Sequence, residues 1–358
     1  MRSTCDKSPG LPFGAGPARN VEIMSSAELS KLVQSVVEPA LLSGPRQYSR
    51  ADVAQRSGVP SEVSRRLWVA LGFAADPDDS SHEYTEADIA AVRDFRSLDT
   101  LSTADPRRQQ AVARSLGQSM ARLAEWQVDL VVTEITDRLT ELLAADPAAD
   151  PTATAQAATD EVLARLQALQ TYAWRRHLAA ALSRSMDGDH ADGTVRDLAV
   201  GFADMVGYTR LTRHLDPEEL AQLLETFETI GTEVITARGG WVIKNVGDEV
   251  MFAAETAAVG ADIALAIQEA TRKDDTTPEL RVGLAYGDVL QRFGDLYGST
   301  VNIAARLTGV ARPGTVLIDD GAAARLAGEP AFTLRHLRSV RVRGFSRLRS
   351  HVLRRNNR

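Results

Sequence analysis

The spacing of the apolar residues changes once along this chain, at residues 186 to 193, and this change limits the folds that the chain can adopt. Before it, from residue 25 to residue 185, leucine, valine and alanine recur at the three- and four-residue intervals of helices. After it, short apolar runs alternate with helical segments, a pattern typical of helices packed on a sheet. The break itself, MDGDHADG, has no periodicity. We therefore predict an all-α domain at 25–185, a linker at 186–193 and an α/β (α+β) domain at 194–358.

Composition narrows the class of protein. Residues 1–24, which include KSPGLPFGAGP, are rich in glycine and proline and are expected to form a disordered tail. The single cysteine, Cys5, rules out an intrachain disulfide, which suits a reducing cytoplasm. No stretch reaches the roughly 18 consecutive apolar residues of a membrane span. The formal net charge of -7 argues against bulk binding of nucleic acid. We expect a cytoplasmic protein with no transmembrane segment and no nucleic-acid partner, although its amphipathic helices leave peripheral membrane association open.

Helix-start signals place several elements. Ser25 and Glu28 form a capping-box signature, and a second one joins Asp216 and Glu219. Proline after aspartate at position 106 opens a long alanine- and leucine-rich segment. Further helices are expected over 152–185, 256–272 and 299–310, and strands near 196–203 and 280–293.

Residues 48–73, YSRADVAQRSGVPSEVSRRLWVALGF, predict two short helices around a Ser-Gly turn, and with HEYTEADIAAVRDF they resemble a MerR-type winged helix. DNA binding requires a basic surface, yet acidic residues outnumber basic ones from Arg46 to Thr100, and Glu62 lies in the second helix. We therefore favour a protein-interaction role for this helix-turn-helix-like segment.

Three segments of the second domain carry candidate chemistry. In VGFADMVGYT an apolar strand ends at Asp204, and Gly207, Tyr208 and Thr209 follow where a helix is expected to start. Free N-H groups at a helix start can bind phosphate oxygens, and a carboxylate at a strand end can hold the accompanying Mg²⁺.

The segment WVIKNVGDEVMF predicts two strands and a tight turn that carries Lys244, Asp248 and Glu249. Alone this is typical of a solvated loop, but Asp248 could supply a second carboxylate for a pair of divalent ions. In DLYGSTVNIAARL, Asn302 and Arg306 stand four residues apart and share one helical face, which alone is typical of any amphipathic helix.

Together FADMVGYT, IKNVGDE and DLYGSTVNIAARL resemble the catalytic motifs of the class III nucleotidyl cyclases, over residues 195–345. The resemblance implies a ferredoxin-like sheet with helices and an adenylate cyclase that converts ATP to 3′,5′-cyclic AMP and pyrophosphate. It implies two Mg²⁺ or Mn²⁺ ions in each active site, bound by Asp204, Asp248 and the main chain of Met205. Asn302 would orient the ribose and Arg306 would neutralise charge on the α-phosphate. The triphosphate would lie against Val206, Gly207, Tyr208 and Thr209.

Lys244 and Asp295 match the purine-selecting pair of the family. A lysine donates to adenine N1 and a carboxylate accepts from the N6 amine, whereas guanine presents these groups reversed. The resemblance further implies a C2 homodimer, in which Asp204 and Asp248 of one protomer meet Lys244, Asp295, Asn302 and Arg306 of its partner.

Two further expectations concern basic and titratable residues. Arg343, in VRVRGF, is a candidate triphosphate contact or a residue of a charged edge strand, and Arg292 allows the same two interpretations. The N-terminal half resembles the regulatory, in some members pH-responsive, domain of actinobacterial cyclases, with His177 and His190 near the linker. A guanylate cyclase and a nucleotide-sensing DNA-binding regulator are the alternatives.

Overall fold

The computed structural model describes residues 25–75, 78, 80–98, 103–186, 195–274, 276–342 and 345–356. The chain forms two compact units, residues 1–179 and 180–358, each described below by itself. The predicted tail and most of the predicted linker lie outside the described residues.

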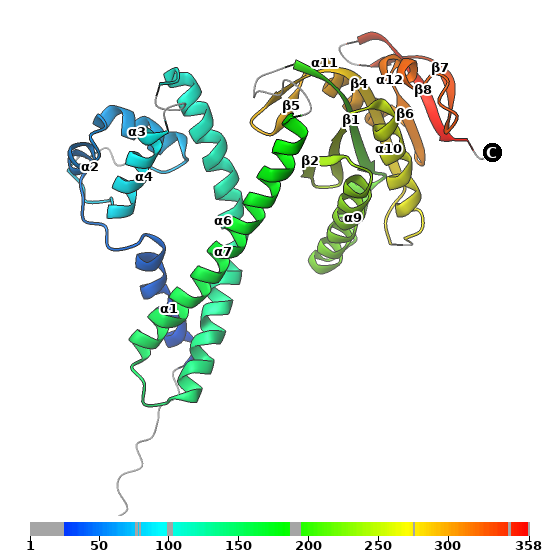
Figure 1. The fold of residues 1–358 in the computed structure, drawn as a ribbon. Coiled ribbons are helices and arrows are strands. Elements are labelled where there is room, and N and C mark those ends of the chain that lie inside the picture. Colours follow the sequence, from blue (N-terminus) through cyan, green and yellow to red (C-terminus); the bar gives the residue numbers. More distant parts are fainter. Residues whose placement is uncertain are drawn as a thin grey trace, which may run out of the picture. The chain divides into compact units, whose positions relative to one another are not determined.

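The N-terminal unit is helical, as predicted (Figure 1). Capping boxes start three of its helices, at Ser25 with Glu28, at Ser49 and at Thr85. Between α2 and α3 the chain turns at Gly58, whose φ of 70° favours glycine. The resemblance of this segment to a winged helix stays a prediction. The helices are α1 (Ser26–Leu41), α2 (Arg50–Ser57), α3 (Ser61–Ala70), α4 (Glu86–Ser97), α6 (Pro106–Ala145) and α7 (Pro151–Met186).

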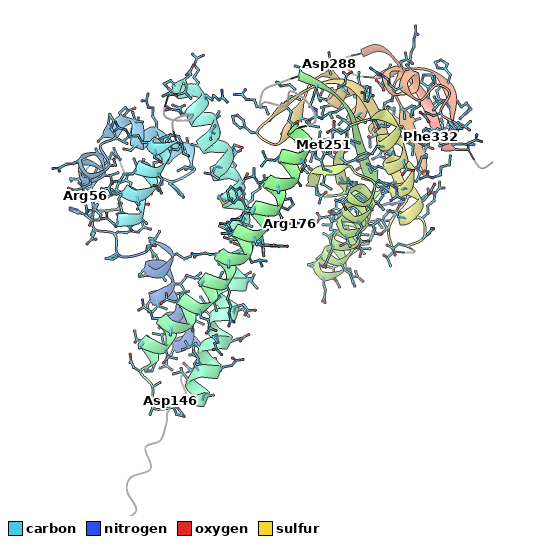
Figure 2. The ribbon with its side chains drawn as sticks, viewed as in Figure 1. Arg56, Asp146, Arg176, Met251, Asp288 and Phe332 are labelled. Carbon is cyan, nitrogen blue, oxygen red and sulfur yellow. The ribbon has the colours of Figure 1, made fainter. Side chains whose placement is uncertain are left out.

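The two long helices α6 and α7 form an antiparallel hairpin, and Asp146 marks its closed end (Figure 2). Ile135 and Leu139 of α6 are fully buried against alanines of α7 and valines of α1. A polar pair also joins α6 to α7, because the Gln170 side chain of α7 donates to the Gln127 side chain of α6 at 2.8 Å. None of the described helices is long and apolar enough to span a bilayer.

The second unit contains a mixed sheet in the order β2-β3-β1-β4-β6-β8-β7, with β5 paired to β4. Neighbouring strands are antiparallel except β4 and β6, which are parallel. The strands are β1 (Val195–Met205), β2 (Trp241–Val246), β3 (Glu249–Ala254), β4 (Leu280–Arg292), β5 (Asp295–Tyr297), β6 (Thr315–Ile318), β7 (Phe332–Val342) and β8 (Phe345–Arg355).

Helices cover both faces of this sheet. The side chains of its central strand β1 point alternately to the two faces, and each face forms a separate core with the helices on it. Ala199 and Ala203 of β1 pack in one core with α9 and α10, whereas Leu198 and Val200 face the other core with α11. The predicted sheet with helices is therefore confirmed. The helices are α8 (Tyr208–Leu211), α9 (Pro217–Ala237), α10 (Ala257–Thr271), α11 (Ser299–Val310) and α12 (Asp320–Arg325).

A glycine in β4 fixes how closely α11 approaches the sheet. A Cβ atom at Gly283 would lie 2.3 Å from the backbone N of Thr308 and 2.4 Å from the carbonyl O of Ala304. Gly283→Ala is therefore expected to displace α11, lowering the free energy of unfolding by about 1–3 kcal/mol, measured by urea denaturation. Gly309→Ala is the matched control, since its Cβ would meet nothing within 4 Å. Equal stability of the two variants would contradict the role of Gly283.

Candidate active site

The site is built around the end of the central strand β1, where Asp204 lies. Its side chain is 14% exposed. Asp204 stands directly opposite Glu249 of β3 and Arg281 of β4. Directly opposite residues of a sheet share a face, so the three side chains lie on the face that α11 covers. The guanidinium of Arg281 donates to the Asp204 carboxylate.

The β2–β3 hairpin brings a second carboxylate to this strand end. Gly247 adopts a φ of 59° in the turn, and the backbone N-H of Met205 donates to the carbonyl of Asp248 at 3.1 Å. Burial raises the pKa of the Asp248 carboxyl, and the neighbouring Asp204 raises it further. The two carboxylates thus lie close enough to disfavour the ionisation of Asp248. The predicted turn is shorter than expected, because Lys244 lies within β2 and Glu249 begins β3.

Glu249 is the third acidic group here, and the sequence did not identify it as part of a site. Burial, followed by repulsion from Asp204 and Asp248, raises its pKa from 4.5 to about 7. Its register opposite Asp204 depends on strand pairing, which the sequence motif alone does not reveal.

This raised pKa predicts how stability depends on pH in the absence of metal. A carboxyl whose pKa is higher in the folded state stabilises the fold below about pH 4.5, and this contribution is lost as the pH rises through about 7. Glu249→Gln should therefore gain melting temperature relative to the wild type between pH 5.5 and pH 8, measured by calorimetry in EDTA. A constant difference between the two proteins over that range would contradict the raised pKa.

Lys244 and Asp295, the predicted base-reading pair, contact each other. The Lys244 ammonium lies 2.7 and 3.0 Å from the two carboxylate oxygens of Asp295. The pair joins β2 to β5, and its side chains are 43% and 31% exposed. A hydrogen-bond donor and an acceptor therefore stand side by side at the surface.

Helix α11 carries Asn302 and Arg306. Asn302 is exposed and Arg306 is half-buried. The Thr308 hydroxyl lies 3.3 Å from the carbonyl of Phe202 and joins the helix to β1. The spacing of four residues places Asn302 and Arg306 on one side of the helix, as the sequence indicates.

The turn after β1 provides backbone donors. Gly207, with a φ of 79°, is the N-cap residue of the short helix α8, and the Val206 N-H donates to the carbonyl of Glu279. Within the described chain, the N-H groups of Gly207, Tyr208 and Thr209 donate to no other group. Such N-H groups at a helix start are available to an anion.

Four further residues were candidates from the sequence. Arg343 and His190 lie outside the described residues. The Arg292 guanidinium lies 5.1 Å from the centre of the Phe293 ring. His177 is exposed on α7.

Comparison with known proteins identifies the family. Residues 192–355 match the adenylate and guanylate cyclase catalytic domain. The chain is 41% identical over 291 residues to a protein of Streptomyces coelicolor named adenylate cyclase, covering 81% of this chain and 74% of that protein. It is 30% identical over 335 residues to a Mycobacterium tuberculosis protein named pH-sensitive adenylate cyclase, covering 85% of this chain and 81% of that protein.

A solved structure, the adenylyl cyclase CyaB from P. aeruginosa, is 22% identical and gives a TM-score of 0.42, covering 46% of this chain and 97% of that chain. The sequence relationships show that the chain belongs to the adenylate and guanylate cyclases, and the predicted class III family is confirmed. Its relatives among the actinobacteria match both of its units.

Proposed function

We propose that this chain is an adenylate cyclase, in which the ribose 3′-oxygen of ATP attacks the α-phosphorus, loses its proton and expels pyrophosphate. The Lys244–Asp295 pair carries this proposal, because it offers a donor for adenine N1 and an acceptor for the N6 amine. Guanine presents an N1 donor and an O6 acceptor, which these side chains match less well. The Streptomyces relative, named adenylate cyclase, agrees with this choice.

The substrate preference provides the test. Lys244→Glu together with Asp295→Cys is expected to lower kcat/KM for ATP at least about tenfold and to raise the ratio of GTP to ATP turnover, because the hydrogen-bonding pattern is changed. Turnover is measured from cyclic nucleotide formed with each substrate and Mn²⁺. A wild type that prefers GTP would contradict the proposed substrate, and an unchanged ratio in the variant would contradict the role of the pair.

Divalent cations fit the acidic end of β1. Asp204 and Asp248 are hard oxygen ligands, and burial, followed by repulsion from Asp204, raises the pKa of Asp248, so a bound cation would favour its ionised form. We assign two Mg²⁺ or Mn²⁺ ions to these two carboxylates and the Met205 carbonyl, with substrate oxygens and water completing the ligands. Bound there, the ions would supply Lewis-acid activation of the 3′-hydroxyl and charge neutralisation.

The other side chains would act on the substrate directly. Asn302 would hold the ribose, and Arg306 would donate to the α-phosphate as negative charge develops during pyrophosphate departure. The N-H groups from Gly207 to Thr209 would bind phosphate oxygens, and Val206 would line the same turn. Arg281, which already bonds to Asp204, is the further cation that the structure adds at this strand end.

We assign the complete site to a homodimer. The hairpin and β5 expose apolar side chains, with Val246 59% and Tyr297 50% exposed, which would suit contact with a second copy. Each site would then combine Asp204 and Asp248 of one protomer with the nucleotide-reading residues of the other. Cytoplasmic location stays a prediction, and so does regulation through the N-terminal unit. The second can be tested by comparing how cyclase activity depends on pH in the full chain and in residues 194–358.

A further inference from the structure

The N-terminal unit contains a basic cleft that the proposed cyclase reaction does not use. A cavity of about 290 Å³ lies between α3 and α6. It is lined by Arg65, Arg66, Val69, Ala70, Gln110 and Arg114. Three of these six side chains are guanidinium groups, in a protein whose formal net charge is -7.

Close packing of the two helices creates the cleft. A Cβ atom at Gly117 of α6 would lie 2.1 Å from the carbonyl O of Leu71, so glycine permits this approach. Ala113 of α6 is buried one helical turn earlier. Gln110 and Arg114, four residues apart, extend one side of α6 along α3. This packing places α6 beside the arginines of α3.

The charge in the cleft is only partly balanced. Arg65 bonds to Glu62 at 3.0 Å and 3.2 Å, and this hydrogen bond lowers the pKa of the glutamate. Arg66 and Arg114 are exposed, and within the described residues neither forms a hydrogen bond or an ion pair. Like charges around one cavity repel each other, and an anion bound between them would relieve this repulsion.

We propose that this cleft binds a small phosphate-bearing ligand, with Arg66 and Arg114 as its phosphate clamp. Planar guanidinium groups form paired hydrogen bonds with phosphate oxygens. Val69 and Ala70 add an apolar surface for an attached organic group. The volume lies just below the range of about 300–1,000 Å³ that is typical of small-molecule sites, so it suits a nucleotide or a smaller ligand.

Calorimetric titration of the full chain in EDTA tests the proposal, with AMP, pyrophosphate and inorganic phosphate as probes. The double variant Arg66→Gln with Arg114→Gln should weaken the binding of AMP or pyrophosphate at least about tenfold, because charge-assisted hydrogen bonds are lost. Arg175→Gln with Arg176→Gln, on the exposed part of α7, removes the same charge and should leave binding unchanged. Comparison of AMP with inorganic phosphate distinguishes an organic phosphate from the free anion.

A second variant distinguishes binding inside the cavity from a general effect of positive charge. Val69 is 51% exposed, so Val69→Trp should fold normally, fill the cavity and also weaken binding at least about tenfold while keeping all three arginines. Equal binding by wild type and both variants would overturn the proposal, as would equal affinity for adenosine, which lacks phosphate. Binding of a short DNA duplex without binding of any of the small probes would overturn it too.

Discussion

Asp204→Ala is expected to lower kcat for cyclic AMP formation at least about 100-fold, because it removes one of two carboxylates proposed to hold the metal ions. The protein should remain folded, since Arg281, which loses its partner, is 32% exposed and can be hydrated. The measurement is cyclic AMP formed from ATP with Mn²⁺, beside circular dichroism of the variant.

Glu228→Gln is the control for the loss of a negative charge, because Glu228 is exposed on α9. It should retain wild-type activity. If the Asp204→Ala protein formed cyclic AMP at a rate within twofold of the wild type, this result would contradict the assignment of Asp204 as a metal ligand.

Two inactive variants should restore activity when co-expressed as mixed dimers. Asp204→Ala and Arg306→Ala damage residues that the proposal places on opposite protomers of one site. In random mixing half of the dimers are mixed, and each mixed dimer has one intact site of two, so about a quarter of the wild-type activity should return. The measurement is the rate of cyclic AMP formation by the purified mixture.

The control pair is Asp204→Ala with Asp248→Ala, because both residues would come from the same protomer and no intact site can form. Recovery should be absent there. Failure of Asp204→Ala and Arg306→Ala to complement each other would show that each chain builds its site alone.

The sequence predicts most of the fold because its helices begin at local signals. The capping boxes at Ser25 and Asp216 are present, and the long helix predicted after Asp105 begins at Pro106. The three-residue strand β5 could not be predicted, since so short a segment has no period of its own. Its pairing with β4 depends on tertiary contact.

The residues of the candidate site also fall into two groups, those that a local motif predicts and those that only the strand pairing reveals. Residues within a local motif, such as Asp204 and Asp248, can be selected from the sequence, and the structure brings these two together. Arg281 and Glu249 join them only through the register of three strands, which pairs positions far apart in the chain. A charged residue between Leu280 and Val282, both fully buried, was the available signal for Arg281.

The contact between Lys244 and Asp295 means that, before any nucleotide arrives, each of these side chains already satisfies the other. At this exposure such an ion pair contributes at most about 1 kcal/mol, so a nucleobase can separate it easily. A base that replaces only one of the two interactions would leave one charged side chain without a hydrogen-bond partner. Selectivity would then arise from what an incorrect base fails to restore, as well as from what adenine supplies.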